Sequence, residues 1–202
     1  MSKGRLEAFS DGVLAIIITI MVLEMKVPHG AGEDGHGAGV TLSDLKPVLP
    51  VFLSYVLSFV YIGIYWNNHH HMLHATKRVT GGVMWANLHL LFWLSLLPFA
   101  TGWMGENQFA AAPSAVYGAV LFMSGLAFVV MQRSTVRVEG SESVLARAVR
   151  RDVKGKLSLV VYGVAIPLAF VSVWASGALY VLVALMWVVP DRRIEREMAG
   201  AE

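Results

Sequence analysis

The feature that most constrains this chain is a series of long apolar stretches, each close to the length of a bilayer crossing. A membrane-spanning helix takes about 20 mostly apolar residues, with a range of roughly 17–25. Because hydrocarbon offers no partner for bare backbone groups, such spans must be helical. The sequence therefore predicts an all-α membrane protein with one domain, residues 1–202. Its six transmembrane helices are predicted at approximately 6–27, 47–68, 83–104, 112–132, 157–174 and 177–191.

Composition excludes the main alternatives to a membrane protein. The chain is 56% hydrophobic and only 15% charged, whereas soluble domains carry about 25% charged residues. A water-soluble monomer of this size would need more polar surface, and a disordered chain would need far fewer apolar residues. The absence of cysteine excludes a disulfide framework, a thiolate metal site and a cysteine nucleophile.

Three of the apolar stretches admit a second interpretation. The first resembles a signal peptide because Lys3 and Arg5 precede it, but Glu7 and Asp11 interrupt its start and no small-x-small cleavage site follows. The last two stretches lie only four residues apart and could form one long helix. The helix-breaking tendencies of Pro167 and Gly177 favour two short helices joined by a tight turn at 174–177.

The distribution of basic residues predicts the orientation in the membrane. With six spans and both termini cytoplasmic, 14 of the 16 lysines and arginines lie inside, as cytoplasmic loops require. Only Lys26 and Lys46 lie outside, together with the glycine-rich segment 29–39. We therefore expect a multi-pass protein of the cell membrane. The inner residues are Lys3, Arg5, Lys77, Arg78, Arg133, Arg137, Arg147, Arg150, Arg151, Lys154, Lys156, Arg192, Arg193 and Arg196.

The arginine-rich segment 132–156 suggests two interpretations. It could bind nucleic acid, but no base-reading module accompanies its charges. An interfacial helix in a cytoplasmic loop explains the pattern better, so no nucleic-acid partner is expected. In that helix the apolar side chains would face lipid and the arginines would face headgroups; the former are Val144, Leu145, Ala148 and Val149, and the latter Arg147, Arg150 and Arg151.

Polar residues inside spans are expensive in hydrocarbon and point to function. On the first predicted helix, Glu7 and Asp11 are four residues apart and share a face near the inner end. A second face carries a stripe with helical spacing, Gly12, Ile16, Thr19 and Leu23. Either ordinary helix packing or the wall of a central pathway in an oligomer fits this stripe, and periodicity cannot choose between them.

Other intramembrane polar groups are Asn87, His89 and Trp93 on the third predicted span, and a histidine cluster, His69–His74, at the end of the second. His70 and His74 have the spacing of two metal ligands on a helix, but carboxylate partners are lacking nearby, so no metal site is predicted. A pH-sensitive interface suits the histidines better. The chain has no phosphate-binding loop, no G-x-S-x-G elbow and no T-V-G-Y-G filter. We therefore expect a protein that is not an enzyme and needs no cofactor.

The start of the first helix resembles a known family. Arg5, Phe9, Ser10 and Asp11 reproduce the R-x-x-x-F-S-D motif of the transmembrane protein 175 family of potassium-permeable channels. The resemblance implies a homotetramer in which the first helix of each subunit lines a pore for potassium ions. It places the pore constriction at Ile16, seven positions after the motif Phe9.

Further roles are implied by the same resemblance. Thr19 would face the permeating ion and Leu23 would extend the apolar seal. The motif residues would support the pore helix by bonding to other helices, with Asn87, His89 and Trp93 as possible partners. The alternative function is a proton-coupled secondary transporter that uses Asp11 and the His69–His74 cluster as a relay.

Overall fold

The computed structural model describes residues 2–23, 25–27, 41–150 and 152–188, and in them the only regular secondary structure is helical, with turns and short loops between the helices. The all-α prediction is therefore confirmed for this part of the chain. The predicted glycine-rich outer loop, 29–39, and the predicted inner arginines at 192, 193 and 196 lie outside the described residues. The elements are α1 (Lys3–Leu23), the 3₁₀ helix η1 (Leu42–Val48), α2 (Leu49–His74), α3 (Gly81–Ser95), α4 (Leu97–Glu106), α5 (Ala111–Glu139), α6 (Val144–Arg150), α7 (Val153–Leu168) and α8 (Val173–Val188).

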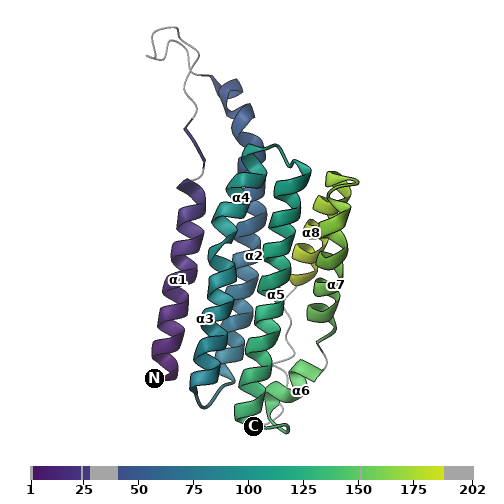
Figure 1. The fold of residues 1–202 in the computed structure, drawn as a ribbon. Helices are drawn as coiled ribbons and strands as arrows, with labels where there is room; N and C mark the ends of the chain where they lie inside the picture. The colour runs from purple at the N-terminus through teal and green to yellow at the C-terminus, as the bar shows by residue number, and fades with distance from the viewer. Residues whose placement is uncertain (1, 24, 28–40, 151, 189–202) are drawn as a thin grey trace.

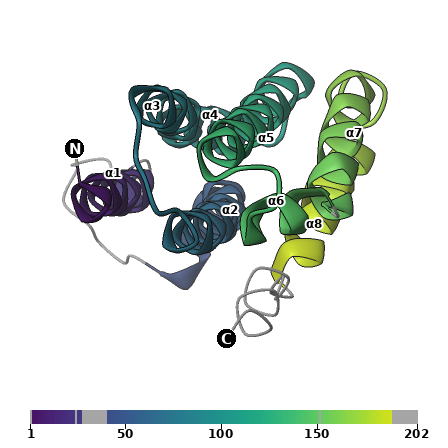
Figure 2. The ribbon, with the colours of Figure 1, turned by 90° about the horizontal axis from the view of Figure 1, so that it is seen from below.

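The long helices stand side by side and alternate in direction (Figure 1). α1 forms one edge of the bundle and packs on α2, α3 and α4, while α7 and α8 form a hairpin at the opposite edge (Figures 1 and 2). α1 begins at the same end at which α2 and α5 finish; we call it the α6 end, because the short helix α6 also lies there. The other end, where α4 meets α5, we call the α4 end.

Four helical segments are long and apolar enough to cross a membrane: Lys3–Leu23, Leu42–His74, Gly81–Glu106 and Ala111–Glu139. The 21 residues of α1 correspond to about 31 Å at 1.5 Å per residue, which matches a hydrocarbon core of about 30 Å. α7 and α8 have 16 residues each, and α8 is a shorter apolar helix. The protein is thus a multi-pass membrane protein with four full-length candidate spans among its described residues.

The third predicted span, 83–104, is not one regular helix. It is divided at Leu96 into α3 and α4. Pro98 lies in the first turn of α4 and has no backbone N–H to continue the hydrogen-bond ladder of α3. The backbone N–H of Leu96 bonds instead to the carbonyl of Trp93, 3.2 Å away, so the chain resumes helical structure immediately after the break.

The turn between the last two helices lies earlier than predicted. α7 ends at Leu168, one residue after Pro167, and Gly177 lies inside α8 rather than in the turn. The hydroxyl of Ser172 accepts a hydrogen bond from the backbone N–H of Ala175 at 3.3 Å, which satisfies an otherwise unpaired donor at the start of α8. A capping serine thus determines where α8 begins, and the single glycine does not break it.

The interfacial helix predicted in the arginine-rich segment is present as α6, but its apolar face is used differently. Leu145 is 1% exposed and belongs to the hydrophobic core, where α6 packs against α5. The prediction that Leu145 faces lipid is therefore wrong. Leu145 therefore anchors α6 to the bundle beside α5.

Tyrosines hold the centre of the bundle together. Tyr61, Tyr117, Tyr162 and Tyr180 pack ring against ring and are each at most 3% exposed. The hydroxyl of Tyr61 donates to the carbonyl of Tyr180 at 2.6 Å, and that of Tyr180 donates to the carbonyl of Ser114 at 3.1 Å. These bonds join α2, α8 and α5, and the ring contacts of Tyr162 add α7, while α1 packs at the edge of the bundle.

Candidate functional site

α1 has one buried face and one exposed face. Its buried residues recur at helical spacing and contact α2, α3 and α4; they are Leu6, Ser10, Leu14, Ile17 and Met21. The opposite face carries the predicted stripe, Gly12, Ile16, Thr19 and Leu23, and all four are exposed. The protomer therefore uses only one side of its first helix for its own packing.

The exposure of the stripe is large for apolar side chains. Ile16 is 58% exposed and Leu23 is 77% exposed, whereas the neighbouring Ile17 is 4% exposed. Beside the stripe, an apolar groove of about 600 Å³ runs between α1 and α4, with Ile16, Ile20 and Trp103 among its lining residues. Exposed apolar surface of this extent marks contact with lipid or with another protein surface.

The hydroxyl hydrogen of Thr19 is already bonded to the backbone of its own helix. Its hydroxyl donates to the carbonyls of Ala15 and Ile16, both 3.0 Å away, which is a common arrangement for threonine in membrane helices. A hydroxyl has one hydrogen and two lone pairs, so the oxygen of Thr19 can still accept from, or coordinate, a group on the exposed side of α1.

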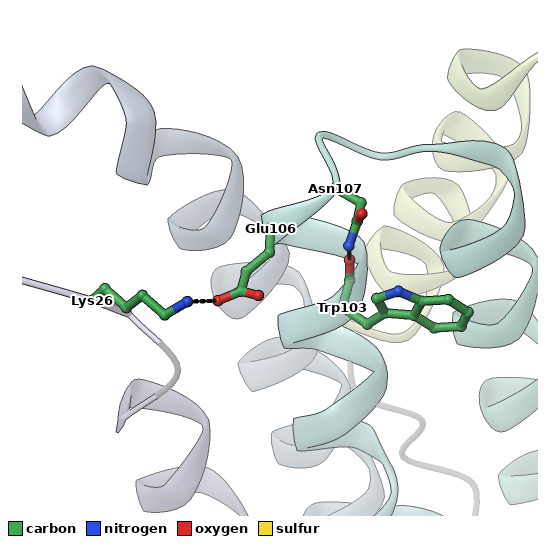
Figure 3. Close-up of polar contacts among 4 residues, drawn as sticks. All are labelled: Lys26, Trp103, Glu106 and Asn107. Carbon is green, nitrogen blue, oxygen red and sulfur yellow. Dashed lines mark hydrogen bonds and ion pairs between the residues drawn. The ribbon is translucent and has the colours of Figure 1, made fainter.

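An ion pair joins the segment that follows α1 to the last residue of α4 (Figure 3). The Lys26 Nζ lies 2.7 Å from the Glu106 Oε1, and the two side chains are 84% and 42% exposed. The side chain of Asn107 donates to the carbonyl of Trp103 at 2.8 Å in the same corner. An ion pair this exposed contributes little stability, so the contact between α1 and α4 depends on the packing of the two helices.

At the α6 end, a buried polar network joins α1 to α2 and α3. The Nε2 of His69 lies 2.7 Å from the Oδ1 of Asn87, and the Nδ2 of Asn87 donates to the hydroxyl of Ser10 at 3.0 Å. Ser10 in turn donates to the carbonyl of Leu6 at 2.8 Å. All three polar side chains are at most 1% exposed. The structure thus brings the motif serine against one expected partner, Asn87, and adds His69, which sequence reasoning had assigned only to the histidine cluster.

The other motif residues lie differently in the protomer. Asp11 is exposed and accepts a hydrogen bond from the indole Nε1 of Trp66 at 3.0 Å. Arg5 and Phe9 are also exposed, and Phe9 is 48% so. The sequence alone did not indicate Trp66 as a partner of the motif. It did link Asp11 with the histidine cluster, and Trp66 lies four residues before His70 and so on the same helix face.

Two of the expected partners, His89 and Trp93, do not form a hydrogen bond with α1. The indole of Trp93 donates instead to the Nε2 of His89 at 3.0 Å, within α3.

The histidine cluster lies at the end of α2. His70 stacks there between Trp66 and His74, with ring centroids 6.3 Å from Trp66 and 6.2 Å from His74. Within the described part of the chain, no three His, Asp or Glu side chains form a group able to hold a metal ion.

Comparison with known proteins gives consistent results. The profile of the family described as endosomal/lysosomal potassium channel TMEM175 matches residues 5–98. A potassium channel of Chryseobacterium sp. (strain P1-3) is 50% identical over 198 residues, which cover 98% of this chain and 98% of that protein. A crystal structure of a lysosomal potassium-selective channel TMEM175 homolog from Chamaesiphon minutus matches with a TM-score of 0.77 and 29% identity, covering 93% of this chain and 96% of that one. The Gallus gallus endosomal/lysosomal proton channel TMEM175 is 36% identical over 105 residues, which are 50% of this chain and 21% of that protein.

The helical membrane fold and these relatives define a multi-pass ion channel. Channels of this class move ions through a protein pathway. The chain belongs to the TMEM175 family of potassium channels, so the resemblance inferred from the R-x-x-x-F-S-D motif is confirmed.

Proposed function

We propose that the protein is a potassium-permeable cation channel, formed by four copies of the chain with α1 of each copy lining the pathway. One observation carries the proposal: α1 buries Leu14 and Ile17 against its own subunit but leaves Ile16, Thr19 and Leu23 exposed. A shared central pathway gives this face a function in every subunit. The proposed channel is not an enzyme and requires no cofactor, because potassium is only the permeant ion.

The proposed gate is a ring of four Ile16 side chains. An apolar neck that is narrow enough loses its water, and a dry neck blocks ions. Movement of α1 that widens the ring would readmit water and let a partly hydrated cation pass. The Leu23 side chains extend this apolar seal toward the α4 end.

Selectivity for potassium is proposed to come from Thr19. Its hydroxyl oxygen can replace part of the water that an ion gives up at the neck, since its hydrogen is held by the α1 backbone. Potassium holds its water less tightly than sodium, so the exchange is easier for potassium.

Direct flux measurement tests this function. Purified protein is reconstituted into liposomes with high internal potassium, and internal pH is followed with a dye. We expect potassium efflux to leave the interior negative, so that protons enter only after a protonophore is added. Empty liposomes and liposomes with sodium in place of potassium are the controls.

Other outcomes of the same experiment identify the alternatives. Proton entry without protonophore that depends on the potassium gradient and keeps a fixed exchange ratio would contradict a channel and favour the proton-coupled transporter with Asp11 and the His69–His74 cluster as relay. Proton entry without protonophore when valinomycin carries the potassium would instead indicate a proton-permeable pathway. That pathway is a second candidate because relatives such as the Gallus gallus protein are named proton channels.

We further propose six spans with both termini in the cytoplasm of the cell and the α6 end facing inward. The charge distribution supports this orientation, and α7 and α8 would be the fifth and sixth spans. Because the chain has no cysteine of its own, single cysteines report accessibility cleanly. With an impermeant thiol reagent on intact cells, we expect Leu42→Cys to react and Lys156→Cys to react only after lysis. The reverse pattern would overturn the orientation.

A further inference from the structure

A groove at the α6 end is lined by three arginines from two helices. It has a volume of about 270 Å³ and lies between the last turns of α5 and the helix α6. Arg133 and Arg137, four residues apart on α5, and Arg150 on α6 provide its charge, and all three are exposed. Since residues four apart share a helix face, the two α5 guanidinium groups present one continuous basic edge.

These charges have no acidic partner within the described part of the chain. None of the three arginines forms an ion pair there. The nearest carboxylate along α5, that of Glu139, accepts hydrogen bonds from the backbone N–H groups of Lys77 and Arg78 at 2.8 and 3.1 Å and is used elsewhere. Three like charges around one groove repel each other, so an anion bound among them lowers the free energy of this corner.

The position of the groove matches the headgroup layer of a bilayer. α5 has 29 residues, which correspond to about 43 Å, roughly 13 Å more than the hydrocarbon core. Arg133 and Arg137 lie about 33 and 39 Å along α5 from Ala111, so both lie beyond the hydrocarbon when α5 enters it at Ala111. Bilayer headgroups at this depth present phosphate groups, whose planar oxygen pairs match the guanidinium fork of arginine.

Apart from Ser141, the surroundings of the arginines are apolar. The side chains of Val136, Ala146 and Val149 line the groove with them. Along α5, Leu126 and Val130 precede Arg133 and Arg137 at positions i, i+4, i+7 and i+11, and both are 38% exposed. An exposed apolar track thus leads from the basic groove toward the bilayer centre, where an acyl chain would lie.

We propose that this groove binds an anionic phospholipid, with the phosphate held by Arg133, Arg137 and Arg150 and one acyl chain along Leu126 and Val130. The charge complementarity requires an anion, and the apolar track selects a lipid over a free phosphate ion. The site lies on α5 and α6, away from α1, and stands whether or not α1 lines a pore.

The proposal is tested with the purified full-length protein in mixed micelles. Binding is followed by the thermal unfolding midpoint and by bound lipid in native mass spectrometry, as phosphatidylglycerol or phosphatidylcholine is added. We expect wild-type protein to prefer phosphatidylglycerol, and Arg137→Gln to weaken that binding about ten-fold, the effect of one charge-assisted bond. Lys156→Gln is the matched control, because it removes one exposed charge from the start of α7, outside the groove.

Further variants separate the possible results. Arg150→Gln, on the other helix, should weaken binding as Arg137→Gln does, and it serves if the α5 variant fails to assemble. Arg137→Lys should bind with intermediate affinity, since it keeps the charge but loses the fork. Equal binding of the two lipids, or equal losses in Arg137→Gln and Lys156→Gln, would overturn the site. Equally tight binding of inorganic phosphate or glycerol phosphate would overturn the lipid as its occupant.

Discussion

Replacing Ile16 with asparagine is expected to raise the resting cation current per assembled channel about ten-fold or more. The amide wets the neck, and lowering the barrier there by about 1.4 kcal/mol, the size of one hydrogen bond, is a factor of ten in rate. Ile16→Ala is expected to raise the current as well, because it widens the ring. Single-channel recording in bilayers, with protein amount measured on the same samples, checks the result.

Ile17 provides the matched control for this experiment. It is the same residue type, one position along, and it is 4% exposed where Ile16 is 58% exposed. Ile17→Ala is expected to cost about 2–5 kcal/mol of stability through the cavity it leaves, with unchanged current through the channels that still assemble. If Ile16→Asn behaves in this way instead, Ile16 packs in an interface and the proposed gate is wrong.

Thr19→Ala accompanies the Ile16 variants as a test of selectivity alone. It removes the only oxygen on the exposed stripe of side chains, but it changes the width of the pathway little. The ratio of potassium to sodium permeability should therefore fall more than the conductance. Reversal potentials with potassium on one side and sodium on the other measure that ratio.

The fold could be predicted from the sequence to the extent that it depends on hydrophobic length. Every described apolar stretch became a helix, because hydrocarbon leaves the backbone no other way to pair its polar groups. The division of α1 into two faces could be predicted only in part. The stripe of Gly12, Ile16, Thr19 and Leu23 was visible as a pattern, but only the structure shows that the neighbouring elements cover the opposite face.

The features that could not be predicted depend on single side chains and on which neighbours they contact in the folded structure. The break at Leu96 and the start of α8 result from Pro98 and Ser172, whose local effects the long apolar pattern obscures. Leu145 was assigned to lipid because a helical pattern distinguishes an apolar face from a polar one, but cannot tell lipid from protein as the neighbour of that face. The pairing of Asn87 with both Ser10 and His69 required knowledge of how α1, α2 and α3 cross.

Replacing Asn87 in this network with leucine is expected to lower the free energy of unfolding strongly. In this network His69 donates to the carbonyl oxygen of Asn87 and the amide of Asn87 donates to Ser10. Ser10 donates to the carbonyl of Leu6 and, more weakly at 3.3 Å, to the same Asn87 oxygen. Leucine keeps the branched shape of asparagine, although it is larger, and it leaves the His69 donor and the Ser10 acceptor buried without a partner. At about 1–3 kcal/mol for each such group, the expected loss is about 2–6 kcal/mol.

Unfolding in mixed micelles, followed by near-ultraviolet circular dichroism, measures that loss, and a second substitution shows where it originates. Adding Ser10→Ala to Asn87→Leu removes one of the two stranded groups, so the double variant should be more stable than the sum of the single losses predicts. His89→Leu is the control, since it changes an exposed polar group one half-turn away on α3 that bonds to Trp93 and not to the buried network. Because Ser10 lies on the buried face of α1, Asn87→Leu channels that still assemble should keep the ion selectivity of the wild type. Normal stability in Asn87→Leu would mean that the network does not hold α1 in place, and changed selectivity would mean that it also shapes the pathway on the other face of the helix.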